Sequence, residues 1–267
     1  MSLAKRVWWG DFTAREFEDL NPHETLAVLP IAATEQHGPH LPVSTDHAIM
    51  HGMLSMVFPI LPDDLDARFL PVQCIGKSNE HIRVPGTLTM DATTIIDAWT
   101  QIGDSVARAG IRKLVIINSH GGNEELMGIV AREMRVRHDM LAVKTSWNRF
   151  GFPDNMFSDD NRAHGIHGDD YETSLMLHFA PHTVEMDQAQ DFTSSTPRAR
   201  QTFKHLAPQS PHAYAWIAGD INADGVAGEA HLATAEKGAA TAAHQARAFV
   251  DLLADVRAMR LEDWLTG

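Results

Sequence analysis

The sequence has very little cysteine, and this limits the kinds of site that it can build. Cys74 is the only cysteine among 267 residues, which excludes an intramolecular disulfide and a thiolate metal cluster. Any metal ion would therefore be bound by histidine and carboxylate side chains, which accept zinc, manganese or iron. Such ligands are abundant, since the chain has 16 histidines and 35 acidic residues.

Excess positive charge and long apolar runs are also missing. The formal net charge is −13 and no run of lysine and arginine is present, so we expect no nucleic-acid partner. No apolar run approaches the roughly 20 residues that a membrane span needs, and residues 1–12 lack the apolar core and cleavage site of a secretion signal. We therefore expect a cytoplasmic protein with no membrane partner.

Short apolar runs alternate with amphipathic stretches along the chain. Strands are predicted at residues 25–32, 69–74, 113–119 and 140–145, and helices at 46–57, 91–108, 124–137, 170–179 and 236–258. This alternation is typical of βαβ units, so we predict an α/β fold in which a single domain, residues 1–267, has a mainly parallel β-sheet flanked by helices. Residues 150–167 and 192–230 are predicted as long loops, which usually carry function or contact another subunit.

The clearest sign of a site follows the first predicted strand. Glu35, His37 and Asp46 lie in one short loop within LPIAATEQHGPHLPVSTD, residues 29–46. In an extended chain, side chains two positions apart point to the same side, so Glu35 and His37 offer an oxygen and a nitrogen together. With Asp46 as a further carboxylate, the loop predicts a divalent-metal site. The alternative is a polar turn in which Asp46 caps the next helix.

His120 follows the third predicted strand, in the segment NSHGGN at residues 118–123. Open α/β sheets bind ligands at the carboxyl ends of their strands, so we expect His120 to meet the first loop. Gly121 and Gly122 would let a substrate approach the backbone closely, or would form an oxyanion-binding turn as in esterases. The esterase alternative is disfavoured because the chain has no Gly-x-Ser-x-Gly segment.

Two further segments contribute candidate residues. In HGIHGDDYETSLML, residues 164–177, Glu172 is expected to bind a metal ion, unless it is a helix-capping glutamate. His167 is expected to be the general acid that protonates a departing nitrogen, unless it only orients Glu172. In GKSNEHIRVPGT, residues 76–87, Glu80 and His81 are expected to face the substrate.

Five segments in sequence together resemble the creatininase (creatinine amidohydrolase) family. They are ExHGxHxPxxxD at residues 35–46, SxEHxxxPGT at 78–87, NSHGGN at 118–123, HGxxxETS at 167–174 and GEAHLATAEKG at 228–238. The resemblance covers nearly the whole chain. It implies an α/β fold around a parallel sheet, a two-metal site, a cytoplasmic location and a ring-shaped homo-oligomer, commonly a hexamer. Carried onto this chain, it implies that Glu35 and His120 hold one ion, His37 holds the other, and Asp46 bridges them.

One position departs from the family pattern. Creatininases carry a glutamate two residues after the strand-end histidine, where this chain has Gly122, and the nearby Glu124 is out of register. The resemblance to members with an HGGN segment implies that Glu172 supplies the missing ligand. Trp147 stands where family members place an aromatic residue near the ring-binding pocket, unless it is an ordinary core residue. Further candidates for substrate contact are Ser78, Gly121, Gly122 and Asn123.

These residues predict an enzyme that hydrolyses a non-peptide C–N bond, in a cyclic or linear amide, within a small polar molecule. Two divalent ions about 3.5 Å apart can share a water, lower its pKa, and stabilise the oxyanion formed when hydroxide attacks the amide carbon. Other members of the family act on a formamide, a peptide or a cyclic ketone, so a hydrolase of a formamide or a cyclic ketone is an alternative. A non-catalytic or regulatory ring assembly that binds a metal or ligand is another, but the intact ligand set favours an enzyme.

Overall fold

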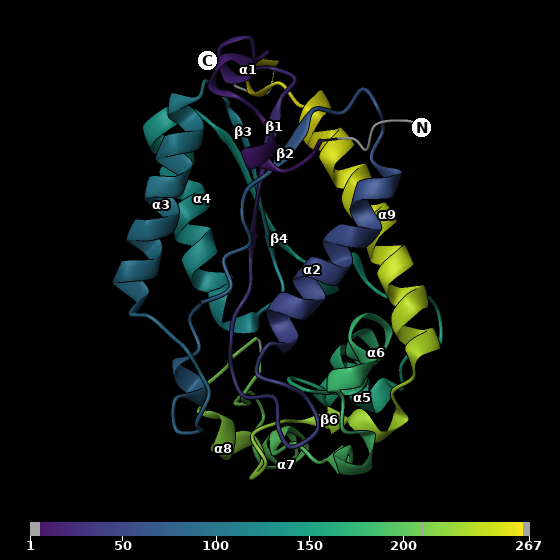
Figure 1. Cartoon of the computed structure of the whole chain (residues 1–267). Coiled ribbons are helices and arrows are strands. Elements are labelled where there is room, and N and C mark those ends of the chain that lie inside the picture. Colours follow the sequence, from purple (N-terminus) through teal and green to yellow (C-terminus); the bar gives the residue numbers. More distant parts are fainter. Residues whose placement is uncertain (1–5, 210, 264–267) are drawn as a thin grey trace.

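Four parallel strands form the centre of the molecule (Figure 1). The computed structural model describes residues 6–209 and 211–263. The strands are β1 (Leu26–Ile31), β2 (Ala67–Phe69), β3 (Lys113–Asn118) and β4 (Leu141–Ser146), arranged in the order β2-β1-β3-β4. The central strands β1 and β3 are buried along their whole length, which explains why they consist almost entirely of apolar residues.

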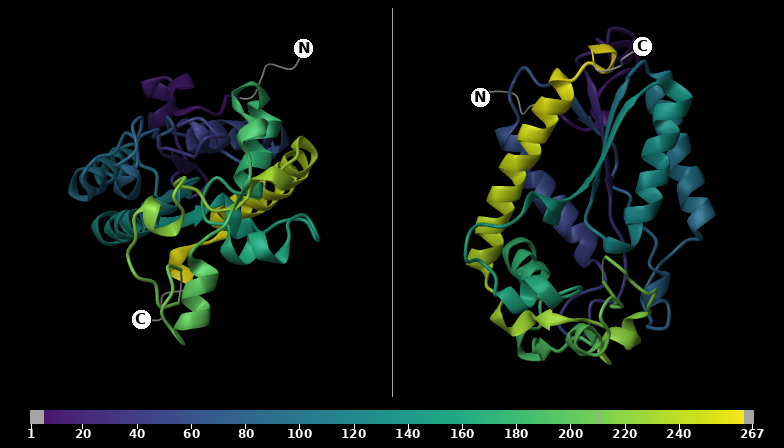
Figure 2. Two further views of the ribbon diagram at one scale, coloured as in Figure 1. Left: turned by 90° about the horizontal axis from the view of Figure 1, so that it is seen from below. Right: turned by 180° about the vertical axis from the view of Figure 1, so that it is seen from behind.

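Helices cover both faces of this sheet (Figures 1 and 2). One face packs against α2 (Thr45–Val57) and α9 (Ala235–Ala258), and the other packs against α3 (Ala92–Arg108) and α4 (Glu124–His138). No helix in the described ranges is long and apolar enough to cross a membrane. The predicted α/β fold, a single domain with a parallel sheet flanked by helices, is confirmed.

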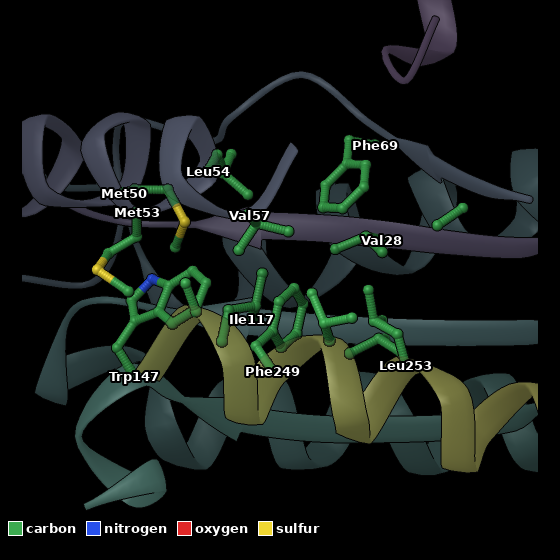
Figure 3. Packing of buried hydrophobic residues seen from close by; sticks show 14 of the residues in the cluster. Val28, Met50, Met53, Leu54, Val57, Phe69, Ile117, Trp147, Phe249 and Leu253 are labelled. Atoms are coloured by element: carbon green, nitrogen blue, oxygen red, sulfur yellow. The ribbon is translucent and has the colours of Figure 1, made fainter. Parts of the chain in front are cut away.

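Successive side chains along each strand point to opposite faces of the sheet, so each face has its own hydrophobic core. Val28 of β1 belongs to the cluster that includes Phe249 of α9, whereas the next residue, Leu29, belongs to the cluster that includes Trp99 of α3. Figure 3 shows the first cluster, in which side chains of α2 and α9 gather between the two helices beside the strands, and Trp147 lies at one end. Both cores hold the strand ends rigidly, and the candidate site is built on those ends.

Shorter elements gather at the end of the molecule where the parallel strands finish (Figure 1). They include α5 (Asp159–His164), α6 (Asp170–Phe179), α7 (Thr196–Thr202) and α8 (Ala218–Ile221), together with the antiparallel pair of β5 (Asp191–Phe192) and β6 (Gly228–Glu229). The remaining helix, α1 (Ala14–Glu18), lies at the opposite end. Residues 150–167 and 192–230, which were predicted as long loops, are loops interrupted by short helices, and helices this short leave little apolar periodicity in a sequence.

The predicted helices are all present, and each boundary lies within one residue of its prediction. The predicted strand at 69–74 is wrong, because β2 ends at Phe69. The chain does continue beside β1, where the N–H groups of Leu70 and Gln73 donate to Val28 and Pro30, each at 2.9 Å. Pro30 of β1 has no N–H to donate to the chain between these two bonds, so the ladder is interrupted there.

Candidate metal centre and its cavity

All five predicted metal ligands converge at the carboxyl ends of β1 and β3. Glu35 and His37 come from the loop after β1, and His120 comes from the residues after β3. Asp46 lies in the first turn of α2, and Glu172 lies in the first turn of α6. The alternative role for Asp46 as a helix cap is not observed, since Ser44 occupies the N-cap position of α2 and the Asp46 side chain is buried in the cluster.

Local hydrogen bonds hold these segments together. The Glu35 N–H donates to the Val43 carbonyl at 3.0 Å and closes the loop that carries the first two ligands. The Ser119 hydroxyl donates to the Asp46 carbonyl at 2.9 Å, which ties the start of α2 to the end of β3. The Asn118 side chain accepts from the His120 N–H at 3.1 Å and donates to its carbonyl at 2.5 Å. These hydrogen bonds therefore fix the backbone at Glu35, Asp46 and His120 independently of one another.

Asp46 lies between the two histidines. Its Oδ1 is 3.5 Å from His37 Nε2, and its Oδ2 is 3.5 Å from His120 Nδ1. On one side, Glu35 Oε1 lies 3.2 Å from His120 Nδ1, and on the other, Glu172 Oε2 lies 3.7 Å from His37 Nε2. The ligand atoms thus form two adjacent groups that share the Asp46 carboxylate.

Several of these atoms are buried without a hydrogen-bond partner. They are both carboxylate oxygens of Glu35, Nε2 of His37 and Oδ2 of Asp46. Buried polar atoms are normally paired, and an unpaired buried charge is strongly destabilising. Three overlapping sets of side chains bring ligand atoms within 4.8 Å of one another. The combination of imidazole nitrogen and carboxylate oxygen fits zinc, manganese or iron, so the residues present fit a divalent ion.

The hydrogen bonds of the two ligand histidines fix which nitrogen is free. His37 Nδ1 lies 2.9 Å from the Glu35 carbonyl, and His120 Nε2 lies 2.7 Å from the Lys77 carbonyl. A carbonyl oxygen can only accept, so those nitrogens carry the hydrogen. When the ring is neutral, the other nitrogen of each residue presents its lone pair to the cluster, as metal-binding histidines commonly do.

The cluster is strongly charged, and its pKa values reflect this. Burial lowers the pKa of His37, but the adjacent Asp46 carboxylate outweighs burial and raises it to about 9. His120 behaves in the same way, and against the opposing effect of burial the Glu35 carboxylate raises its pKa to about 10. Burial raises the pKa of Glu172 to about 8. The buried carboxylates therefore attract positive charge, whether protons or metal ions.

Two further histidines stack beside the cluster. The rings of His81 and His167 lie 4.3 Å apart at an interplanar angle of 29°. His167 donates its Nε2 hydrogen to the Gln36 carbonyl at 2.7 Å, so its Nδ1 lone pair faces Glu35 Oε1 at 3.5 Å. Burial holds the pKa of His167 well below its usual value. The neutral ring therefore presents a proton acceptor to the cluster.

Gln36 is a residue of the site that the sequence analysis missed. Its Oε1 accepts from the Gly38 N–H at 2.9 Å and its Nε2 donates to the Gly225 carbonyl at 2.7 Å, so the orientation of the amide is fixed. The same Nε2 lies 2.7 Å from His81 Nδ1, which must accept. His81 therefore carries its hydrogen on Nε2, which faces Glu35 Oε1 at 3.5 Å.

Ser78 and Asn123, which we expected to contact the substrate, instead support the ligands. Both are completely buried. The Ser78 hydroxyl lies 3.3 Å from His120 Nε2, and the Asn123 side-chain oxygen accepts from the Lys77 N–H at 3.0 Å. Glu80 is closer to the expected role, since it is partly exposed and its Oε1 lies 4.0 Å from His120 Nε2.

Gly122 occupies a position that has no room for a side chain. A Cβ atom there would lie 2.2 Å from the Lys77 carbonyl oxygen and 2.6 Å from both Glu80 Oε1 and His120 Nε2. At Gly121 a Cβ atom would meet nothing within 4 Å. Gly122 is therefore required by the Lys77 carbonyl that orients His120, whereas Gly121 is not required by packing.

A cavity of about 110 Å³ opens beside the cluster, and we call it the inner chamber. Trp147 lines it and also packs edge-on against Phe249 at 5.0 Å, so it is a core residue that reaches the cavity, and its role toward a substrate stays a prediction. Glu124 lines it as well, but its carboxylate accepts from Ser146 and pairs with Arg149 at 3.0 Å. The other lining residues are Ile49, Asn118, Ser119, His120, Gly121, Ser146, Asn148, Ile166, Tyr171 and Glu172.

Comparison with known proteins identifies relatives across most of the chain. A family model described as Creatininase, creatinine amidohydrolase, matches residues 10–253. The mycofactocin precursor peptide peptidase of Mycolicibacterium smegmatis is 30% identical over 181 residues, which cover 67% of this chain and 66% of that protein. The creatinine amidohydrolase of Pseudomonas putida is 27% identical over 210 residues, which cover 73% of this chain and 80% of that protein. The chain thus spans about two thirds of the length of the first relative.

Solved structures share the fold. A putative creatinine amidohydrolase from Bacteroides fragilis matches with a TM-score of 0.78 at 22% identity, covering 97% of this chain and 99% of the other. Two creatininase structures also match, each at 23% identity. One is described with Mn and has a TM-score of 0.71, and the other is a mutant described as Zn-Zn type and has a TM-score of 0.72. Both cover 96% of this chain and 100% of the other. At this level of identity, the similarity establishes the fold.

Proposed function

Because the chain belongs to the creatininase family, a family of metal-dependent amidohydrolases, we propose that it hydrolyses a C–N bond of an amide in a small polar molecule. The observation that carries this proposal is the convergence of five ligand side chains whose buried atoms lack other partners. The inner chamber beside them supports it, because its lining combines polar groups with the aromatic ring of Trp147.

The proposed centre holds two divalent ions, of zinc, manganese or iron. Glu35 and His120 would hold one ion, His37 and Glu172 the other, and Asp46 would offer one oxygen to each. When bound, such ions lower the pKa of a water molecule and polarise a carbonyl oxygen. The protein contributes the fixed geometry, since each ligand histidine is oriented by a backbone carbonyl.

His167 is the residue that we propose to move a proton. Its Nε2 hydrogen is held by the Gln36 carbonyl, so only Nδ1 can take up or release a proton on the side of the cluster. In the proposed reaction, His167 accepts a proton at Nδ1 and then donates it to the departing nitrogen, acting as the general acid. A neutral ring with a low pKa suits such a temporary carrier, because it readily gives the proton up.

The proposal extends to the assembly and location of the protein. As the family resemblance implies, we propose a homo-oligomeric ring, commonly a hexamer, located in the cytoplasm. Light scattering on the purified chain tests the assembly. A mass several times 29.5 kDa supports it, and a mass of one chain at micromolar concentration contradicts it.

Hydrolysis and its dependence on metal test the proposed function directly. The purified protein would be assayed against a panel of creatinine, small formamides, other cyclic amides and short peptides, before and after chelation. We expect at least one amide to be hydrolysed, activity to be lost on chelation, and zinc or manganese to restore it. A metal-loaded protein that hydrolyses none of these amides would indicate the non-catalytic alternative, and hydrolysis that survives complete metal removal would contradict the mechanism.

A further inference from the structure

A second cavity, which we call the outer chamber, adjoins the inner chamber. Its volume is about 210 Å³, and it shares four lining residues with the inner chamber, namely Asn148, Ile166, Tyr171 and Glu172. The other residues that line it are Phe152, Phe157, Asn161, Arg162, Gly165 and Asp169. The outer chamber therefore begins at the proposed ligand Glu172 and leads away from the metal centre.

Aromatic rings form much of the wall of the outer chamber. Phe152 contacts Phe157 and Tyr171 edge to face, with ring centroids 5.1 Å apart in each case. The Tyr171 hydroxyl donates to Gln245 Oε1 at 3.2 Å, which fixes the orientation of its ring. Aromatic side chains favour offset or edge-on contact with another planar ring, so this wall suits a planar apolar group.

The unpaired charge beside the outer chamber is positive. Arg162 of α5 is exposed, and no side chain in the described part of the chain pairs with its guanidinium. Asp169 also lines the chamber, but its carboxylate already accepts from the Asn161 side chain at 2.9 Å and from the Glu172 N–H at 3.0 Å. A guanidinium recognises carboxylates well because it can donate two parallel hydrogen bonds.

The two chambers differ in volume, and the volume decides which of them can hold an aromatic ring. In another protein, a closed apolar cavity of about 150 Å³ is enough to bind benzene. The outer chamber exceeds this volume, whereas the inner chamber, at about 110 Å³, falls below it. An aromatic ring would therefore fit the outer chamber, and the inner chamber would receive only the smaller reacting group.

We infer that the outer chamber is a binding subsite for a planar aromatic group that carries an anionic substituent such as a carboxylate. The ring packs against Phe152, Phe157 and Tyr171, and the anion pairs with Arg162. The inference rests on the proposed hydrolase function only in that it places the scissile amide of the same molecule in the inner chamber. The substrate would then carry three groups, namely an aromatic ring, an anionic substituent on that ring and a separate amide.

Binding of benzoate to the metal-loaded full-length protein tests the subsite without any turnover. Calorimetry would compare benzoate with acetate, which has the same carboxylate, and with benzamide, which has the same ring without the charge. We expect benzoate to bind about tenfold more tightly than either, since it alone uses both the ring wall and the guanidinium. Equal affinities for benzoate and acetate would overturn the inference, because any carboxylate could then be binding the metal ions.

Two arginine variants locate the charge that matters. Arg162→Gln should weaken benzoate binding about tenfold and leave benzamide binding unchanged. Arg132→Gln removes an equally exposed arginine from α4 and should leave both affinities unchanged. The inference fails if the two variants bind benzoate equally well. In crystals soaked with 4-bromobenzoate, the bromine anomalous peak should lie in the outer chamber, and a peak found only elsewhere would also overturn it.

These measurements separate the subsite from the proposed function. If benzoate binding depends on Arg162 but no amide is hydrolysed, the subsite stands and the hydrolase proposal fails. If amides are hydrolysed but benzoate binding does not depend on Arg162, the hydrolase stands and the subsite is wrong.

Discussion

Glu172 Oε2 lies 3.7 Å from His37 Nε2, although the two residues belong to segments that are far apart in the sequence. The same oxygen accepts from the Gly168 N–H at 2.7 Å, so the carboxylate is held in place by the start of its own helix. The capping role and the proposed ligand role are therefore compatible. This geometry supports the proposal that Glu172 replaces the glutamate for which Gly122 leaves no room.

Glu172→Gln should remove a negative ligand and reduce metal affinity about 10-fold to 100-fold or more. That range is known for residues that support metal ligands, and the loss of a direct ligand should cost at least as much. Glu124→Gln is the matched control, because Glu124 lies near the same cavity but pairs with Arg149 and should cost about 1 kcal/mol of stability or less. Metal content measured by mass spectrometry distinguishes them. The assignment is wrong if Glu172→Gln keeps two ions while Glu124→Gln keeps one.

Gly122→Ala should weaken metal binding without changing any ligand. Its Cβ would lie 2.2 Å from the Lys77 carbonyl oxygen, which must move away and release the Nε2 hydrogen of His120. We expect a loss of about 10-fold in metal affinity. Gly121→Ala is the control, since its Cβ meets nothing within 4 Å. Equal metal affinity in the two variants would show that the carbonyl does not orient His120.

Gln36→Glu should change the tautomer of His81. The glutamine Nε2 donates to His81 Nδ1, whereas a glutamate can only accept and would draw a hydrogen onto that nitrogen. Nitrogen-15 NMR of labelled histidine should show His81 protonated on Nε2 in the parent protein and on Nδ1 in the variant. The turnover number should fall about 10-fold with little change in KM. An unchanged His81 spectrum would contradict the proposed role of Gln36.

Metal binding at pH 7 should release protons. Without metal ions, the raised pKa values of His37, about 9, and His120, about 10, keep both rings protonated at neutral pH. A metal ion needs their lone pairs, so metal affinity should rise as the pH rises toward these pKa values and should fall in acid. Glu172, with its pKa raised to about 8, is protonated as well, so calorimetry in buffers of different ionisation enthalpy should detect about three protons released per chain. No proton release would show that the histidines are neutral before metal binds.

Much of the fold, and the convergence of the predicted ligand residues, could be predicted from the sequence because both depend on local patterns. Apolar strands and amphipathic helices have distinct periods, and the predicted ligands directly follow strand ends or begin helices. The family resemblance drawn from five motifs is confirmed by the match over residues 10–253. The choice of ligands itself stays a prediction that awaits a metal-loaded structure.

Other features depend on contacts that no local pattern records. Gln36 lies between the ligands Glu35 and His37, and no local pattern singled it out, yet its side chain contacts His81 from another loop. Asn123 looked available to a substrate, but its amide is occupied by the backbone of distant segments. Pro30 of β1 interrupts the ladder beside the strand that the apolar residues at 69–74 predicted.

The most direct test of this account is anomalous diffraction from a crystal of the protein loaded with zinc or manganese. The account predicts two metal peaks about 3.5 to 4 Å apart. One should contact Glu35 and His120, the other should contact His37 and Glu172, and Asp46 should contact both. A crystal grown in excess metal that shows no peak at these side chains, or a single peak without Glu172 as a ligand, would contradict the proposed two-metal centre.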